Sequence, residues 1–240
     1  MNIVIPMAGL GSRFASAGYS DPKPFIDVAG KPMIVRVMEN LSHPNARFIL
    51  LARAEHIVNN ANAIARIEAE FDVVFVPIDK LTEGTACTVL YARNYLELDS
   101  PVIIANSDQI IDNCFEQYLE DIRVRDLDGS ILTFVDPEKN PKWSFAKLNS
   151  NDLVSEVREK KPISEYATVG IYYFKKAGEM VDNIVQMVIE NDRTNNEFYI
   201  CPVYNYLIAE QKKIGIFNIE QSAMHGIGTP EDLNAYLRLI

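Results

Sequence analysis

Cysteine, histidine and tryptophan are scarce in this sequence, whose 240 residues include three cysteines, three histidines and one tryptophan. The cysteines, Cys87, Cys114 and Cys201, have no paired spacing and lie in apolar or helix-like segments. We therefore expect buried, reduced thiols rather than a disulfide framework, which is typical of a cytosolic protein. The histidines follow no zinc-ligand spacing, so a zinc module of the common kinds is excluded.

Long apolar runs and an excess of positive charge are also missing. No run reaches the roughly 20 apolar residues that cross a bilayer, and no signal peptide is recognisable. Against 33 acidic residues stand 23 basic ones, which gives a formal net charge of −10. Nucleic acids and membrane surfaces are anionic and attract a basic face, so neither partner is expected. We expect a cytoplasmic protein that holds anionic ligands with local clusters of positive charge.

Apolar residues make up 48% of the chain, which is enough for one large core, and no linker-like segment interrupts them. Up to residue 128, apolar strands alternate with helical patterns, which predicts a mostly parallel, Rossmann-like sheet covered on both faces. From residue 129 on, short β-rich runs separated by turns predict an antiparallel extension of that sheet. We expect a single α/β domain over residues 1–240, built as a three-layer sandwich.

The expected elements follow from apolar spacing and from turn residues. In the first half we expect strands at 3–5, 48–52, 73–76 and 102–105, and helices at 32–40, 55–70 and 86–95. In the second half we expect strands at 129–135, 145–148, 153–157 and 168–174, and helices at 179–190 and 201–210. A last helix is expected to begin at Thr229, which is followed by Pro230 and Glu231.

A glycine-rich loop follows the first apolar strand of the chain. Gly9 and Gly11 carry no Cβ, so consecutive backbone N–H groups can turn toward an anion. Arg13 adds a planar guanidinium, and Lys23 adds an ammonium whose backbone is stiffened by a proline on each side. The alternative is an ordinary strand-to-helix turn with two solvated charges, but the joint pattern favours a phosphate site.

Two familiar phosphate loops do not match this pattern. A Walker A loop needs four residues between its glycines and a Gly-Lys-Ser/Thr ending, which is absent. The dinucleotide fingerprint needs a third glycine where Phe14 stands, and an acidic residue at the end of the next strand. The loop therefore belongs to neither class.

Two further polar stretches follow predicted strands, at the edge where parallel sheets bind their ligands. Gly84 and Thr85 enter a predicted helix, where free N–H groups can approach a base or a phosphate; a simple helix cap is the alternative. Asp108 comes soon after the strand 102–105. A lone carboxylate there suits Mg²⁺ beside a triphosphate, and the alternative is an ordinary turn residue.

Several short motifs together resemble the nucleotidyltransferases that join a nucleoside triphosphate to a sugar phosphate or a similar small phosphate. They occur in the family's order along nearly the whole chain. The motifs are Met7-Ala8-Gly9-Leu10-Gly11-Ser12-Arg13-Phe14, Pro22-Lys23-Pro24, Gly30-Lys31-Pro32, Gly84-Thr85-Ala86, Glu159-Lys160-Lys161-Pro162, the strand 167–172 and Gly228-Thr229-Pro230-Glu231-Asp232. The resemblance implies pyrophosphate release, Mg²⁺ as cofactor, and a nucleotide-binding half at 1–128 that precedes an acceptor-binding half at 129–240.

The resemblance also implies roles for individual residues. Arg13 and Lys23 would neutralise the triphosphate during attack, and Asp108 would hold Mg²⁺. The implied nucleotide-binding residues are Met7, Ala8, Gly9, Leu10, Gly11, Ser12, Arg13, Lys23, Glu83, Gly84, Thr85, Ala86 and Asn106. The implied acceptor-binding residues are Lys147, Glu159, Lys160, Lys161, Gly170 and Glu197, and the extra lysine leaves Lys160 and Lys161 as alternatives.

Two departures from the sugar-specific members bear on the substrate. Gly226 stands where those relatives place a second metal aspartate, which implies a metal held by Asp108 with phosphates and water, or by another group. Trp143, Phe145 and Lys147 stand where those members carry a glycine-containing strand, which argues against an ordinary hexose acceptor. We expect CTP and a small non-hexose phosphate as substrates, in the synthesis of a bacterial surface polysaccharide.

Two other functions remain as alternatives. A nucleotide-sugar-dependent glycosyltransferase could share the sheet. However, the segment around Asp108 has no second aspartate of the kind typical of that class, and a glycosyltransferase would not explain the glycine-rich loop. A non-catalytic nucleotide-binding protein is the other alternative, for which Gly226 is the only hint. A homo-oligomer is compatible with each of these interpretations.

Overall fold

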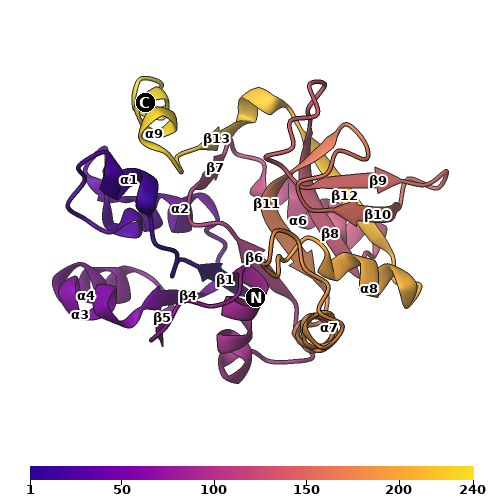
Figure 1. The fold of residues 1–240 in the computed structure, drawn as a ribbon, viewed down its shortest axis with the longest axis horizontal. Helices are drawn as coiled ribbons and strands as arrows, with labels where there is room; N and C mark the ends of the chain where they lie inside the picture. Colours follow the sequence, from indigo (N-terminus) through magenta and orange to yellow (C-terminus); the bar gives the residue numbers. More distant parts are fainter.

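The computed structural model describes residues 1–240 and contains a nine-stranded central sheet (Figure 1). Its parallel part has the order β6-β1-β4-β5. These strands are β1 (Asn2–Pro6), β4 (Arg47–Arg53), β5 (Val73–Ile78) and β6 (Val102–Ala105). All four strands expected in the first half are therefore present, and Ile3, Val4 and Ile5 of the central β1 are fully buried.

The second half extends this sheet beyond β6, mostly with antiparallel strands. The strands are β8 (Gly129–Val135), β9 (Phe145–Leu148), β10 (Val154–Arg158), β11 (Tyr166–Phe174) and β12 (Ile214–Ile219). β11 is antiparallel to β6 and joins the two halves. The exception is β12, which was not expected from the sequence and pairs parallel with β8.

Helices cover both faces of the sheet. Ile3 and Ile5 point into a buried cluster of 36 residues and Val4 into a second cluster of 30, as alternate residues of a strand do. The first cluster is covered by α2 (Met33–Asn40), α4 (Ala61–Glu70), α6 (Phe115–Arg125) and α9 (Pro230–Leu237). The second is covered by α5 (Thr85–Val89), α7 (Ala177–Ile189) and α8 (Val203–Ala209). The predicted three-layer α/β sandwich is confirmed.

Two predicted helices are each divided in the structure. The expected helix at 55–70 is α3 (Ala54–Asn59) followed by α4. The break lies at Asn60, whose backbone N–H and side-chain amide both donate to the His56 carbonyl, at 3.1 and 2.9 Å. Asparagine commonly competes with the helix in this way. The expected helix at 86–95 is α5 followed by the 3₁₀ helix η2 (Leu90–Tyr95).

Short elements near the amino and carboxyl ends have no clear sequence signal. They are α1 (Ser12–Ser16), η1 (Lys23–Phe25), the hairpin of β2 (Asp27–Val28) with β3 (Lys31–Pro32), β7 (Gln109–Ile111), η3 (Gln221–Ala223) and β13 (Met224–Gly226). β7 and β13 pair antiparallel, with Gly226 opposite Gln109. This ladder returns the end of the chain to the edge of the sheet where β6 ends (Figure 1). Beyond it, the Thr229 hydroxyl accepts from the Asp232 N–H at 3.1 Å and caps α9 as predicted.

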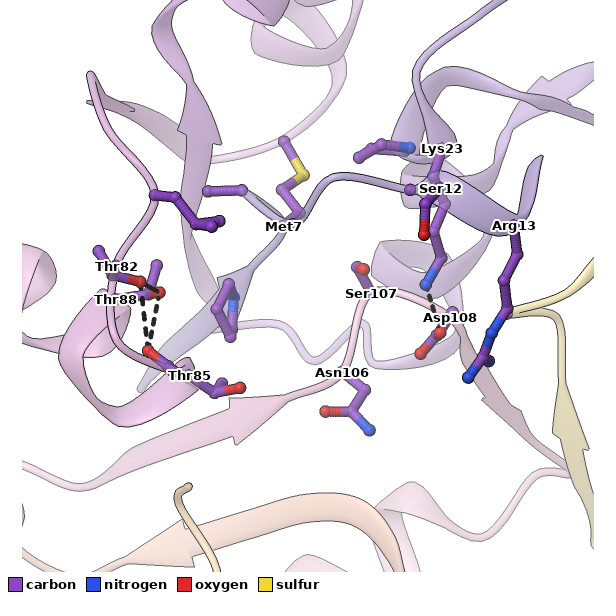
Figure 2. Close-up of a pocket in the computed structure, with 18 of the residues that line it drawn as sticks. Met7, Ser12, Arg13, Lys23, Thr82, Thr85, Thr88, Asn106, Ser107 and Asp108 are labelled. Atoms are coloured by element: carbon purple, nitrogen blue, oxygen red, sulfur yellow. Dashed lines mark hydrogen bonds and ion pairs between the residues drawn. The ribbon is translucent and has the colours of Figure 1, made fainter. Parts of the chain in front are cut away.

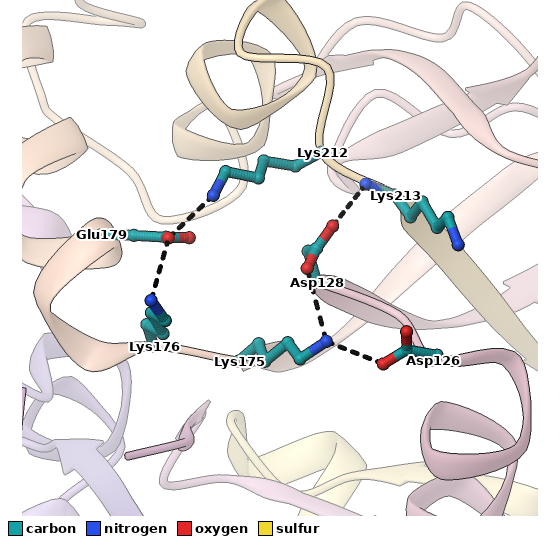
Figure 3. Close-up of polar contacts among 7 residues, drawn as sticks. All are labelled: Asp126, Asp128, Lys175, Lys176, Glu179, Lys212 and Lys213. Carbon is teal, nitrogen blue, oxygen red and sulfur yellow. Dashed lines mark hydrogen bonds and ion pairs between the residues drawn. The ribbon is translucent and has the colours of Figure 1, made fainter. Parts of the chain in front are cut away.

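A network of ion pairs ties together the elements at the opposite end of β11 (Figure 3). Lys175 pairs with Asp126 at 2.7 Å and lies 3.6 Å from Asp128, while Glu179 accepts from Lys212 at 2.7 Å. The ammonium of Lys213 forms no ion pair, and its side chain points away from the network. These groups are partly or largely exposed to solvent, so each pair contributes little to stability.

The three cysteines are unpaired. Cys114 and Cys201 are buried as expected, whereas Cys87 is only half-buried. No helix combines the length and the apolar character needed to cross a membrane.

Tyr204 links α8 to the strands of the second half. Its fully buried hydroxyl lies 2.8 Å from the Tyr173 carbonyl and 3.0 Å from the Ser130 carbonyl. Because Tyr204→Phe removes this donor, we expect the free energy of unfolding to fall by about 1–2 kcal/mol. Urea denaturation measures the change. Tyr206→Phe is the matched control, because the Tyr206 hydroxyl bonds Glu190 at the surface and its loss should cost about 0.5 kcal/mol or less.

Candidate functional site

A cavity of about 480 Å³ lies where β1 and β6 end (Figure 2). Parallel strands that neighbour each other end at the same edge of a sheet, so the loops that follow them meet there. The predicted residues that line this cavity are Met7, Ala8, Gly9, Gly11, Ser12, Arg13, Lys23, Gly84, Thr85, Asn106, Asp108 and Glu197. Pro6, Phe14, Pro24, Leu81, Thr82, Thr88, Ser107 and Gly228 complete the lining.

Three of the predicted nucleotide-binding residues line neither this cavity nor its neighbour. Leu10 is 65% exposed on the outer side of the glycine-rich loop. Ala86 is fully buried, and its N–H donates to the Phe198 carbonyl at 2.9 Å. Glu83 is exposed and pairs with Arg193 at 2.5 Å. Their sequence positions are beside lining residues, but their side chains point elsewhere.

The glycine-rich loop places Arg13 and Lys23 on one side of the cavity. Gly11 has a φ of +61°, and a Cβ there would lie only 3.2 Å from the Lys23 Cβ, so glycine permits both the turn and the close approach. The ammonium of Lys23 forms an ion pair with the carboxylate of Asp108 (Figure 2). The guanidinium of Arg13 lies near this pair and has no ion-pair partner within the protein.

Threonine hydroxyls lie on the opposite side of the cavity (Figure 2). The hydroxyls of Thr82 and Thr88 share a hydrogen bond at 2.6 Å, and each lies 3.2 Å from the Gly84 carbonyl, which accepts from the one whose proton is not used between them. Gly84, with a φ of +112°, is the N-cap residue of α5, and Thr85 makes no side-chain cap. The simple cap that was the alternative role for Thr85 is therefore not formed, which leaves its hydroxyl free.

The segment 197–199 closes this side of the cavity against the loop 83–86. A Cβ on Gly84 would overlap the backbone of Phe198, so only glycine allows this contact. Phe198 donates its N–H to the Glu83 carbonyl at 2.8 Å, and the guanidinium of Arg193 lies 4.1 Å above its ring. Glu197 therefore faces the first cavity, although the sequence pattern had placed it with the acceptor.

A second cavity of about 270 Å³ adjoins the first one, and Thr85 and Asn106 line both. Glu159 and Gly170 are the predicted acceptor residues that line it. Gly170 has a φ of +94°, and a Cβ there would overlap the side-chain amide of Asn106. Other lining residues were not predicted to bind the acceptor, and they include Lys142, Ser144, Thr168, Tyr172 and Tyr199. Thr168 and Tyr172 belong to the motif strand 167–172, whereas Lys142 and Ser144 lie in a segment without a distinctive spacing.

The three predicted lysines lie at or beyond the rim of the second cavity. Lys160 donates to the Tyr199 hydroxyl at 2.6 Å, and Tyr199 lines the cavity. Lys161 is exposed and does not line it, so Lys160 is the one held beside the cavity. Lys147 is exposed on β9 and also lies outside.

Burial shifts the pKa values of two polar groups of the second cavity. Burial raises the pKa of Glu159, although its carboxylate accepts a hydrogen bond from the Ser144 hydroxyl. Burial also raises the pKa of Tyr199, so its phenol stays protonated and donates to Glu197. A chain of hydrogen bonds therefore runs from Lys160 through Tyr199 to Glu197, and it connects the two cavities.

The donor set around Asp108 fits a magnesium ion that arrives with phosphates. No group of three or more His, Cys, Asp or Glu side chains could enclose a metal. Mg²⁺ is commonly held by only one or two carboxylates, with phosphate oxygens and water as the other ligands. Gly226 offers no side chain, and it lies opposite Gln109, the neighbour of Asp108. Asp108 is therefore the residue that would hold the ion.

Sequence comparison identifies the family. The family model described as nucleotidyl transferase matches residues 3–237, which is nearly the whole chain. The chain belongs to the nucleotidyl transferase family. The resemblance drawn from the short motifs is confirmed, and the lining of the first cavity consists largely of those motifs.

The curated relatives of this nucleotidyl transferase are distant. It is 26% identical over 221 residues to the bifunctional protein GlmU of Methanocaldococcus jannaschii. The aligned region covers 90% of this chain and 49% of that protein. It is 27% identical over 237 residues to the catalytic subunit beta of mannose-1-phosphate guanylyltransferase of Drosophila pseudoobscura, with coverage of 95% and 59%. The chain thus spans about half to three-fifths of the length of these relatives.

Solved structures share the fold of this nucleotidyl transferase. A nucleoside-diphosphate-sugar pyrophosphorylase from Vibrio cholerae matches with a TM-score of 0.82 and 24% identity, covering 98% of this chain and 99% of that one. The inositol-1-phosphate CTP transferase from T. maritima matches with a TM-score of 0.75 and 14% identity, covering 99% and 94%. At these identities the matches establish the fold alone.

The raised pKa of Glu159 predicts a pH dependence of stability. The native state binds this proton more tightly than the unfolded state, so the stabilisation is present in acid and is lost as pH rises through the raised pKa. Glu159→Gln has no such loss, so it should gain stability relative to wild type between about pH 4 and pH 7. Urea denaturation across this range measures the difference. A parallel response of the control Glu165→Gln, at an exposed glutamate that forms no ion pair, would contradict the assignment.

Proposed function

We propose that this nucleotidyl transferase joins a nucleoside triphosphate to a sugar phosphate or a similar small phosphate and releases pyrophosphate. The observation that carries the proposal is the pair of adjoining cavities that share Asn106 and Thr85. One has two cations and a carboxylate on one side, and the other is smaller and lined by hydroxyl groups and a half-buried carboxyl. This arrangement suits a triphosphate and a phosphorylated acceptor that meet at the shared wall.

The reaction we propose is an in-line displacement at the α-phosphorus. An oxygen of the acceptor phosphate attacks, the bond from the α-phosphorus to the bridging oxygen breaks, and pyrophosphate leaves with that electron pair. A phosphate monoester is already ionised near neutral pH, so positioning and charge neutralisation can supply most of the acceleration. Arg13 would hold the β and γ phosphates, and Lys23 would hold the α-phosphate.

Asp108 would hold Mg²⁺ in this reaction. The ion supplies additional neutralisation of the charge that builds on the phosphates. Ser107 and Asn106 lie next to Asp108 in the chain and line the same cavity, which keeps polar groups along the path of the phosphates. We propose that residues 1–128 mainly bind the nucleotide and residues 129–240 mainly bind the acceptor, although Glu197 and Gly228 of the second half line the first cavity.

For the finer specificity we propose CTP and a small non-hexose phosphate. The indole of Trp143 occupies part of the wall of the second cavity, and its ring packs edge-on against Phe134 at 5.3 Å, which fixes its position. Glu159, Ser144 and Thr168 are available to bind hydroxyl groups of the acceptor. The similar proteins differ in the nucleotide that their names state, because they include a mannose-1-phosphate guanylyltransferase as well as an inositol-1-phosphate CTP transferase. The guanylyltransferase argues against CTP. A role in surface polysaccharide synthesis would follow from such a product.

A screen of products tests both levels of this proposal. Each of the four nucleoside triphosphates is combined with Mg²⁺ and with phosphates of hexoses, polyols, inositol and choline, and pyrophosphate release is measured. We expect release with CTP and a non-hexose phosphate. Release with GTP and mannose 1-phosphate would replace the finer proposal and keep the coarser one. Release of nucleoside diphosphate from a nucleotide sugar would identify a glycosyltransferase, and triphosphate binding without turnover would identify a nucleotide-binding protein.

Lys23 gives the sharpest test of the proposed mechanism. Lys23→Ala removes the charge nearest to Asp108, and we expect pyrophosphate release to fall by about 10²–10³-fold. Lys213→Ala is the matched control, because this lysine lies outside both cavities and forms no ion pair (Figure 3). Thermal unfolding of both variants checks that the fold is kept. Unchanged turnover of Lys23→Ala would refute the role of Lys23.

A further inference from the structure

The ion pair between Lys23 and Asp108 joins two loops that are 85 residues apart in the chain (Figure 2). Lys23 begins η1 and Asp108 follows β6, and their side chains are only 20% and 22% exposed. The ammonium contacts Oδ2 of the carboxylate. In the protein without ligands, a cation of the protein's own therefore occupies a position at Asp108 that a metal ion would need.

The end of the chain packs against the same carboxylate oxygen of Asp108 that Lys23 contacts. A Cβ on Gly228 would overlap Oδ2 of Asp108, so the backbone of this segment packs directly against the carboxylate. The N–H of Ile227 donates to the Asp108 carbonyl at 2.9 Å and holds the two segments together. Backbone and ammonium thus both crowd Oδ2, and a further cation at this carboxylate would be repelled by the charge of Lys23.

No other acidic group compensates for this occupied carboxylate. Glu197 lines the same cavity, but its carboxylate accepts the hydrogen bond of Tyr199 on the side of the second cavity. Gly226 has no side chain, and no cluster of three potential ligands exists anywhere in the structure. A free divalent cation would thus find one carboxylate, already neutralised by Lys23.

We propose that Lys23 excludes the divalent cation from Asp108 until a triphosphate draws the ammonium away. Lysine has a flexible stem and a compact charge, so it can move from a carboxylate to a neighbouring phosphate oxygen. The cation then takes the vacated carboxylate, and metal and triphosphate enter together. Each ligand strengthens the binding of the other by the same factor, because such coupling is reciprocal. This inference uses the proposed triphosphate site but not the identity of the base or of the acceptor.

Binding of Mn²⁺ to the nucleotide-free protein tests the exclusion directly, with electron paramagnetic resonance reporting the free ion. Lys23→Met should raise the affinity about tenfold, which is the effect of removing one charge-assisted contact of about 1.4 kcal/mol. Lys23→Arg keeps a cation at the carboxylate and should show no gain. In the double variant Lys23→Met with Asp108→Asn the gain should disappear.

Arg13→Gln is the matched control for simple charge removal. It deletes one positive charge from the same cavity, but Arg13 does not pair with Asp108. Exclusion by Lys23 predicts little change in Mn²⁺ affinity for this variant. An equal gain in Arg13→Gln and Lys23→Met would mean that only the overall charge matters, and would overturn the proposal. Wild-type protein that binds Mn²⁺ as tightly as Lys23→Met would also overturn it.

The reverse effect is measured with inorganic tripolyphosphate in the presence of EDTA, by isothermal titration calorimetry. Asp108→Asn releases Lys23, so metal-free tripolyphosphate should bind several-fold more tightly than to wild type. Glu197→Gln removes a negative charge from the same cavity without releasing Lys23 and should give a smaller gain. An equal gain in both variants would count against the exchange of Lys23 between carboxylate and phosphate.

These measurements need no turnover, so they separate the exclusion from the proposed reaction. Tripolyphosphate binding with no pyrophosphate release on any acceptor would sink the proposed function and leave the exclusion standing. Circular dichroism and thermal unfolding of each variant establish that it is folded. If Lys23→Met fails to fold, Lys23→Gln keeps a polar side chain of similar reach and carries the same expectation.

Discussion

The adjacency of β1 and β6 is the constraint on which the site depends. Because these parallel strands pair directly, the loops after Pro6 and Ala105 leave the same edge of the sheet. Two loops that are far apart in sequence thereby bring a cation and a carboxylate into contact. The three apolar residues of β1 are fully buried between two layers of helices, so the apolar core fixes the place from which the glycine-rich loop starts.

Close backbone contacts at a few glycines join the cavities to one another. Gly84 lets the backbone of the segment 197–199 press against the loop before α5, and Gly170 lets the Asn106 amide lie against β11. Gly228 does the same for the carboxylate of Asp108. A side chain at any of these three positions would force two segments apart. The two cavities therefore share a wall because the chain has no side chain where the segments meet.

Much of the fold could be predicted from apolar spacing. The strands β6, β8 and β9 have the expected bounds, because β6 is a continuous apolar run and β8 and β9 are short β-rich runs separated by turn residues. The break between α3 and α4 at Asn60 was not predicted, since it depends on the Asn60 side chain donating to the His56 carbonyl rather than to solvent. β7 and β13 were missed because three residues carry no periodicity; only the contact between distant segments makes them strands.

The candidate site, too, was predicted only in part. Arg13, Lys23, Thr85 and Asp108 line the first cavity as expected, because they follow buried strands in motifs with distinctive spacing. Glu83 and Leu10 lie beside such residues, yet their side chains point away from the cavity, which spacing along a loop cannot indicate. The lining of the second cavity comes from several segments of both halves, and only part of it, such as Glu159 and the strand 167–172, carries a motif.

By itself, the sequence determined the family, the layered α/β class and the loops that carry charge, because local composition and short motifs encode all three. Only the tertiary structure decided that Lys23 pairs with Asp108, that Glu197 faces the first cavity, and that Gly226 lies opposite Gln109. These outcomes depend on strand order and register. Contacts between segments separated by tens of residues are set by how the whole core packs, and no local pattern records them.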